Sequence, residues 1–214
     1  MPNVLTHLGL GDHILCCGLV RAVAERSLGQ VVTWAKPHNL ESVRFLFADM
    51  QRIEVRPIID RLHTSGELLV VGYNNLDRSI PFDQSFYQSA GVPFEQRWSG
   101  FTPVSDMGRE WQVYHDLGVC GPYAFVHDDP ERGMEIGPRC TELPVVRPIK
   151  GLTNNILDYR LLIRYAAEVH VIPSSFGVLA DSMDLHQPLF WYKRLRSYPD
   201  TEHPTLRNQW TILA

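Results

Sequence analysis

The 214-residue sequence lacks several features that would identify whole classes of protein. No apolar run approaches the roughly 20 residues that a membrane-spanning helix needs. The N-terminus does not combine a basic region with an apolar one, as a secretory signal does. We therefore expect a cytoplasmic protein without a membrane span. The net charge of -4 lacks the basic excess that neutralises nucleic-acid phosphates, so we expect no nucleic-acid partner.

Cysteine is scarce, and its spacing indicates neither a zinc site nor a redox motif. The four cysteines form no Cys-x-x-Cys pair, the pattern of many zinc and redox sites. Cys16 and Cys17 are neighbours on a predicted helix, where adjacent side chains diverge and rarely form a disulfide. We expect reduced thiols and no metal site.

Two common nucleotide-binding motifs are also missing. Gly9 and Gly11 begin a Gly-x-Gly-x-x-Gly pattern, but Ile14 occupies the position of the third glycine. The acidic residue expected about 20 positions later is absent as well. No Gly-Lys-Ser/Thr phosphate loop occurs. The sequence therefore predicts neither a dinucleotide fingerprint nor a Walker-type site.

What the sequence does contain is an alternation of short apolar runs and helical patterns. Strands are expected at residues 3–8, 30–35, 53–58, 67–72, 123–127, 143–146, 168–172 and 188–192. Helices are expected at residues 14–26, 40–50, 82–90, 153–167 and 175–183. The continuous run Leu68 to Val71 favours a strand covered on both faces. This order predicts an α/β fold with mostly parallel sheets.

The two halves repeat this order, which predicts two small Rossmann-like units, residues 1–115 and 116–214. Residues 73 to about 115 lack clear periodicity and mark the crossover between the units. Ligands of such units bind at the carboxyl ends of the strands, so we expect a ligand cleft between the halves. Five tryptophans and a small core in each half are compatible with a homodimer.

A glycine-rich turn follows the first predicted strand and is the first candidate site. Gly9 and Gly11 would expose backbone N–H groups at a helix N-terminus, a geometry that favours an anion. Asp12 has two interpretations. It caps the first helix, or it acts as a general base that deprotonates a hydroxyl. His7 and His13 are alternative bases in the same turn.

A second turn, Ser174 to Gly177, follows the strand at 168–172 and opens a short helix. Serine hydroxyls and N–H groups at a helix N-terminus bind phosphate or diphosphate. The alternative is that Ser174 or Ser175 serves only as a helix cap. One serine can cap the helix while other donors remain available to a ligand.

Charged residues follow the strand at 123–127 and form a third cluster. Arg132 could clamp a phosphate with two hydrogen bonds. Asp128 and Asp129 are more typical of a solvated Asp-Pro turn than of a metal site. His170, in the middle of a predicted strand, is more typical of a hydrogen-bonded core residue than of a ligand.

These clusters, in this order, resemble the GT-B class of glycosyltransferases. They are most similar to the heptosyltransferase type, which uses ADP-heptose, and to related bacterial sugar transferases. The segments that carry the resemblance are Leu8-Gly9-Leu10-Gly11-Asp12, residues 86–94, and residues 167–183 followed by Gln187-Pro188. Each half has about 100 residues, fewer than this class usually has. Pro173-Ser174-Ser175-Phe176 replaces its usual Gly or Asp-Ser-Gly pattern.

The resemblance implies a compact GT-B fold and a glycosyltransferase that needs no metal and no separate cofactor. It would move a sugar from a nucleotide-diphosphate sugar to a saccharide or other hydroxyl acceptor. Asp12, or failing that His13, would be catalytic. The implied donor- or phosphate-binding residues are Gly9, Gly11, Arg132, Lys150, Ser174, Ser175, Phe176 and Gly177. The alternatives are a non-catalytic nucleotide or nucleotide-sugar binding module and a sugar-nucleotide epimerase on the same scaffold.

Overall fold

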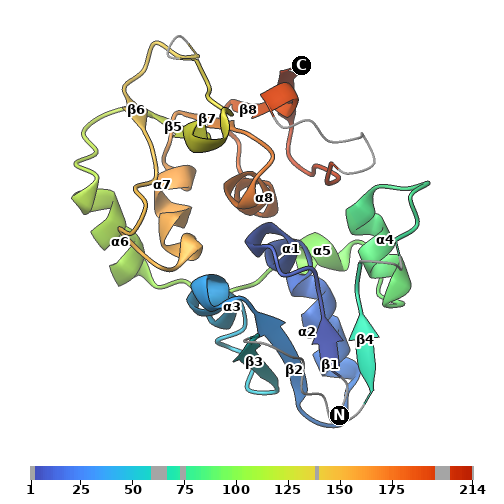
Figure 1. Ribbon diagram of the computed structural model, residues 1–214. Helices are drawn as coiled ribbons and strands as arrows, with labels where there is room; N and C mark the ends of the chain where they lie inside the picture. Colours follow the sequence, from blue (N-terminus) through green and yellow to red (C-terminus); the bar gives the residue numbers. More distant parts are fainter. Residues whose placement is uncertain (1–2, 59–66, 73–75, 138–139, 196–202, 214) are drawn as a thin grey trace. The chain divides into compact units, whose positions relative to one another are not determined.

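The chain forms two compact α/β units, each built on a parallel sheet (Figure 1). The computed structural model describes residues 3–58, 67–72, 76–137, 140–195 and 203–213. Unit 1 contains the described residues up to Ser105 together with residues 203–205, and unit 2 contains the others. The predicted fold class is confirmed. The division at Ser105 differs from the expected one at residue 115, because the helix in between packs within unit 2.

The sheet of unit 1 has four parallel strands in the order β3-β2-β1-β4. They are β1 (Asn3–Leu5), β2 (Val31–Ala35), β3 (Ile53–Pro57) and β4 (Leu68–Val70). Every residue of the two central strands, β1 and β2, is buried. The expectation that the run from Leu68 is covered on both faces is wrong, because β4 is a half-buried edge strand that pairs only with β1.

The first predicted helix of unit 1 is divided into two by a buried tyrosine. The helices of this unit are α1 (Leu10–Leu15), α2 (Cys17–Arg26), η1 (Pro37–Asn39), α3 (Leu40–Leu46), α4 (Phe82–Ser89) and α5 (Gln96–Ser99). The Tyr87 hydroxyl accepts from the Leu19 N–H (3.2 Å) and donates to the Leu15 carbonyl (2.8 Å). A continuous helix would join these two backbone groups directly. The inserted hydroxyl therefore accounts for the break at Cys16.

The sheet of unit 2 has five parallel strands in the order β6-β5-β7-β8-β9. They are β5 (Ala124–His127), β6 (Val145–Val146), β7 (Glu168–Val171), β8 (Leu189–Tyr192) and β9 (Trp210–Leu213). The first four lie within the ranges expected from the sequence. The sequence analysis missed β9, a half-exposed edge strand whose pairing with β8 no local pattern indicates.

The helices of unit 2 differ most from expectation. They are α6 (Met107–Asp116), η3 (Pro130–Arg132), η4 (Ile156–Tyr159), α7 (Arg160–Arg164), α8 (Ser175–Ser182) and η5 (Lys193–Leu195). In the mostly polar α6, Glu110 is buried and pairs with Arg160 at 2.7 Å, a contact that periodicity does not reveal. The expected helix at 153–167 is the shorter η4–α7 pair. Asn155 caps it by accepting from the Leu157 N–H.

Two expectations about the whole chain can be compared with the described residues. Among them, no helix has both the length and the apolar character needed to cross a bilayer. The four cysteines are free thiols, as expected.

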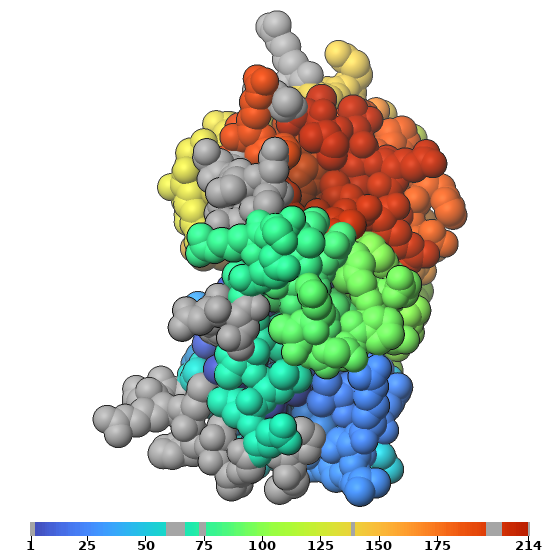
Figure 2. Space-filling model, turned by 90° about the vertical axis from the view of Figure 1, so that its right-hand side faces the viewer, coloured from blue at the N-terminus to red at the C-terminus, as the bar shows by residue number. Residues whose placement is uncertain are grey.

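Helices α2 and α5 approach each other so closely at Gly18 that no side chain fits between them. A Cβ atom on Gly18 would lie 1.7 Å from the backbone oxygen of Gln96. Figure 2 shows the green segment that contains α5 resting on the blue segment that contains α2. Because the opposing atom belongs to the backbone, a larger residue at Gly18 requires one helix to move.

We expect Gly18→Ala to lower the free energy of unfolding by about 3 kcal/mol, because overpacking against backbone cannot be relieved by a change of rotamer. The matched control is Gly108→Ala on the exposed side of α6, where a Cβ makes only an ordinary contact. That change should be neutral or stabilising by up to about 1 kcal/mol, because alanine favours helix. Denaturant unfolding measures both values, and equal stabilities of the two variants would contradict the prediction.

Candidate functional site

Polar residues gather at the carboxyl edge of the unit 1 sheet, after β1 and β2. The Thr6 hydroxyl donates to the His7 carbonyl (3.1 Å) and lies 3.2 Å from Nδ1 of His13. Asn39 precedes α3 as its N-cap residue but makes no side-chain capping bond. Its amide instead donates to the Leu8 carbonyl at 3.3 Å. Asn39 therefore anchors the glycine-rich turn from the neighbouring loop.

Asp12 lies in the first turn of α1, and Gly9 is the N-cap. One carboxylate oxygen of Asp12 folds over Gly9, 2.6 Å from the position that a Cβ would take. Asp12 and Gly11 are both half-buried. A carboxylate at this position is stabilised by the helix dipole, and it remains in reach of solvent. The geometry is compatible with both interpretations of Asp12, as a residue that stabilises the first turn and as a base.

His13 is held neutral and turned inward. Its side chain is 2% exposed, and burial together with the nearby Lys36 cation lowers its pKa to about 4. The Thr6 hydroxyl has one proton, which points to the His7 carbonyl. Nδ1 of His13 therefore carries the proton that reaches Thr6, and Nε2 is an acceptor. Nε2 has no hydrogen-bond partner among the described residues. In this conformation the His13 side chain is shielded from solvent.

In unit 2, Ser174 begins α8 and contacts an imidazole. Its Oγ accepts from the Gly177 N–H at 3.3 Å, so Ser174 caps this helix. The same Oγ lies 3.1 Å from Nδ1 of His127, the last residue of β5. The ring of Phe176 covers His127, with 4.4 Å between the ring centres. Burial lowers the pKa of His127 to about 4, so this imidazole is neutral. The sequence analysis gave no role to His127, which it left within the strand expected at 123–127.

The four residues of the second turn differ in what they can offer a ligand. Gly177 is buried, and a Cβ on it would lie 2.8 Å from the Trp191 ring. Its N–H is already bonded to Ser174. Gly177 therefore lets α8 pack on the sheet. The N–H groups of Ser175 and Phe176 lie in the first turn of α8, where a helix provides no acceptor for them.

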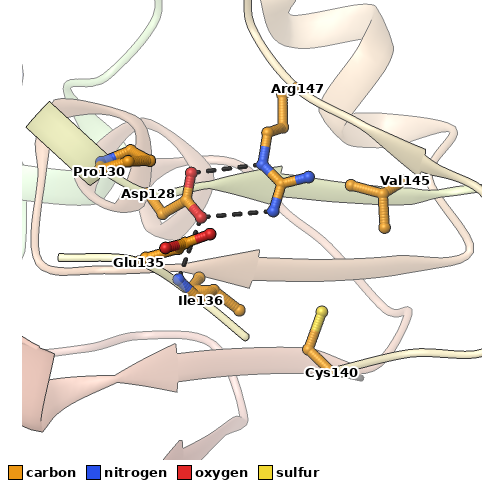
Figure 3. Close-up of a pocket in the computed structure, with 7 residues that line it drawn as sticks. All are labelled: Asp128, Pro130, Glu135, Ile136, Cys140, Val145 and Arg147. Atoms are coloured by element: carbon orange, nitrogen blue, oxygen red, sulfur yellow. Dashed lines mark hydrogen bonds and ion pairs between the residues drawn. The ribbon is translucent and has the colours of Figure 1, made fainter. Parts of the chain in front are cut away.

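A cavity of about 370 Å³ lies at the carboxyl ends of β5 and β6 (Figure 3). Asp128 follows β5 and Arg147 follows β6. Arg147 donates to both Asp128 carboxylate oxygens at 3.3 Å, and Asp128 also accepts from the Ile136 N–H at 3.0 Å. The Asp128 side chain is only 3% exposed, so its interpretation as part of a solvated turn is wrong.

The cavity combines charged and apolar walls. Pro130, Ile136 and Val145 supply apolar surface, while Arg147 and Glu135 supply charge. Sequence reasoning missed Arg147. Its signal was its place directly after the short apolar run that contains β6, the parallel neighbour of β5.

Arg132 and Lys150 lie at the surface near the turn after β5. The Arg132 side chain is 70% exposed and 3.4 Å from Asp129. Lys150 is 91% exposed and 3.7 Å from Glu131. Ion pairs this exposed contribute little stability, so both cations can turn toward an anion. No described contact joins either of them to Ser174.

His170 is a core residue, as expected. It is buried, with Nε2 3.0 Å from Glu168 and Nδ1 3.0 Å from the Tyr192 hydroxyl. Within the described ranges, no three His, Cys, Asp or Glu side chains lie close enough together to hold a metal ion.

Comparison with known proteins finds similarity in structure and none in sequence. No protein-family model matches the sequence. No curated protein matches it either.

Solved glycosyltransferase structures share the fold. A glycosyl transferase family 9 protein from Veillonella parvula superposes with a TM-score of 0.62 at 10% identity, over 99% of this chain and 86% of its own. The ADP-heptose lipopolysaccharide heptosyltransferase II of E. coli superposes with a TM-score of 0.54 at 11% identity, over 99% of this chain and 89% of its own. TibC of enterotoxigenic E. coli is an iron-containing dodecameric glycosyltransferase. It superposes with a TM-score of 0.57 at 14% identity, over 88% of this chain and 57% of its own.

A second TibC structure, in complex with ADP-D-β-D-heptose, superposes with a TM-score of 0.56 at 13% identity, over 94% of this chain and 61% of TibC. The chain thus spans less than two thirds of TibC. At these identities the comparisons establish the fold, which is the one that the sequence resemblance predicted.

We expect His13→Gln to flatten the pH dependence of stability. The unfolded chain protonates His13 near its ordinary pKa of 6.5, whereas the folded chain does so near 4. Protons therefore favour the unfolded state as the pH falls below about 6.5. Between about pH 7 and pH 5 the wild type should lose about 2 kcal/mol more than the variant.

Denaturant unfolding at both pH values measures this difference. Above about pH 7 the imidazole is neutral in both states, so the two proteins should change in parallel there. Identical losses at about pH 5 would contradict a buried neutral His13.

Proposed function

We propose that the chain transfers a sugar from a nucleotide-diphosphate sugar to a hydroxyl acceptor, without a metal. The observation that carries the proposal is the polar carboxyl edge of the unit 2 sheet, where the Ser174–His127 pair and the Asp128–Arg147 cavity follow neighbouring strands. The fold supports it, because glycosyltransferases share this fold and TibC binds ADP-D-β-D-heptose. Ligands of parallel α/β sheets bind at this edge.

The donor would be held by unit 2. The N–H groups of Ser175 and Phe176 would donate to the diphosphate, because the first turn of a helix favours anions. Arg132 and Lys150 are exposed cations that would neutralise the leaving diphosphate in place of a metal. The cavity beside Arg147 has apolar and polar walls, which suits a ring system that carries hydroxyl groups.

Asp12 would act as the base in unit 1. Its carboxylate is half-buried, whereas His13 is 2% exposed and holds its proton toward Thr6. The acceptor oxygen would bond to the anomeric carbon as the bond from that carbon to the diphosphate breaks. The acceptor proton would pass to Asp12, and the nucleoside diphosphate would leave.

A non-catalytic nucleotide-sugar binding module is the second candidate. The position of Asp12 over Gly9 favours it, because stabilising the first turn of α1 is a sufficient role for that carboxylate. Product analysis separates the candidates. Nucleoside diphosphate released only with acceptor indicates a transferase, binding without turnover indicates the module, and donor conversion without acceptor indicates an epimerase.

We expect nucleoside diphosphates and their sugars to raise the melting temperature of the protein. A ligand at about 100 times its Kd stabilises the fold by about 2.7 kcal/mol. Ser174→Ala should weaken this binding about tenfold, because the loss of the cap hydroxyl disorders the first turn of α8. Ser182→Ala at the other end of α8 is the matched control and should keep the full ligand shift. If no such ligand shifts the melting temperature, both candidates fail.

We expect Asp12→Asn to slow transfer by about 10²- to 10⁴-fold, because an amide cannot accept the acceptor proton. The melting-temperature shift with donor should remain, since the donor contacts lie in unit 2. Asp116→Asn, an exposed change on α6, controls for the loss of one negative charge. Transfer at the wild-type rate in Asp12→Asn would assign Asp12 to helix stabilisation alone.

A further inference from the structure

The connection between β8 and β9 takes an unusual path. These strands are parallel neighbours, so the chain between them must return to the start of the sheet. Such a crossover is usually a helix on the same sheet. Here residues 203–205 of the connection belong to unit 1, and the chain re-enters unit 2 at Leu206. Along the sequence, β9 of unit 2 therefore follows a short segment that belongs to unit 1.

Residues 203–205 are held in unit 1 through contacts between Thr205 and a buried ion pair. Asp83 on α4 and Arg97 on α5 are both fully buried and pair with each other. Asp83 accepts from the Thr205 N–H (3.0 Å) and lies 3.2 Å from its hydroxyl, while Arg97 donates to the Thr205 carbonyl. The Gln84 amide donates to the same hydroxyl at 3.2 Å. We name this arrangement the Thr205 clamp.

A second clamp holds the chain where it re-enters unit 2. One oxygen of the fully buried Asp181 accepts from the N–H groups of Arg207 (2.9 Å) and Asn208 (3.1 Å) and from the Trp210 indole (2.9 Å). The Asn208 amide donates to three carbonyls at the end of α8, at 2.9, 3.2 and 3.3 Å. Figure 2 shows the red C-terminal segment that follows on the surface of unit 2. We name this arrangement the Asp181 clamp.

We propose that Leu206 is a mechanical joint that couples the two units. It is the single residue between Thr205, fixed in unit 1, and Arg207, fixed in unit 2. One residue has two soft backbone torsions, so it can rotate but cannot extend. A displacement or local opening at one clamp is therefore transmitted to the other.

On its unit 2 side the joint connects to α8 through Asp181, and Ser174 is the N-cap of the same helix. Asp181 lies seven positions after Ser174, about 10 Å along the helix axis. Any effect of the joint on donor binding would rest on the proposed function. The mechanical coupling between the clamps is independent of that function. Its test therefore uses amide hydrogen exchange of the full chain, with no ligand and no activity measurement.

Thr205→Val weakens the first clamp while leaving the Asp83–Arg97 ion pair intact. We expect amide exchange in α8, in the other unit, to become roughly tenfold faster, because the local opening equilibrium there loses its support. In the reverse direction, Asn208→Ala should speed exchange in α4 to a similar extent. Asp116→Asn, far from both clamps in sequence and exposed, is the control and should change exchange in neither helix.

Three glycines inserted between Thr205 and Leu206 keep every clamp residue but make the joint extensible. In this background Thr205→Val should speed exchange around its own clamp and leave α8 unchanged. The proposal is overturned if each single substitution affects only its own unit, or if the effect across units survives the insertion. Either result would show that the clamps hold the chain without coupling the units.

Discussion

Parallel strand pairing is the constraint on which the rest of this structure depends. Each described strand of both sheets runs parallel to its neighbours. Parallel pairs cannot be joined by tight hairpins, so every connection crosses over. The loops that leave the strands therefore meet at one edge of each sheet, which is where Asp12 and Ser174 lie. The same constraint requires a crossover between β8 and β9, and residues 203–205 of that crossover belong to unit 1.

The two edges share an electrostatic design. In each unit an imidazole places Nδ1 beside a hydroxyl, the buried His13 beside Thr6 and the partly buried His127 beside Ser174. Burial lowers both pKa values to about 4, so neither ring contributes a fixed positive charge near neutral pH. An anion at these edges would have to be bound by backbone N–H groups and exposed cations.

Strands with continuous apolar runs were predictable because burial needs only the local composition. The alternation of these runs with helices was enough to predict the fold class. Prediction failed where an element depends on a distant partner. The polar helix α6 buries Glu110 only because Arg160 neutralises it, and β9 exists because β8 offers an edge. The first helix is broken by the Tyr87 hydroxyl, a residue far along the chain.

The sequence by itself determined the α/β class, the two-fold repetition of the pattern and the two turns at which candidate site residues lie. Only the tertiary structure decided which side chains of those turns are available. It buried His13, committed Gly177 to packing and paired Asp128 with Arg147. The physical reason is how far apart along the sequence the interacting residues lie. Helix and strand signals are encoded in neighbouring residues, whereas burial and charge pairing depend on contacts between residues that only the folded chain brings together.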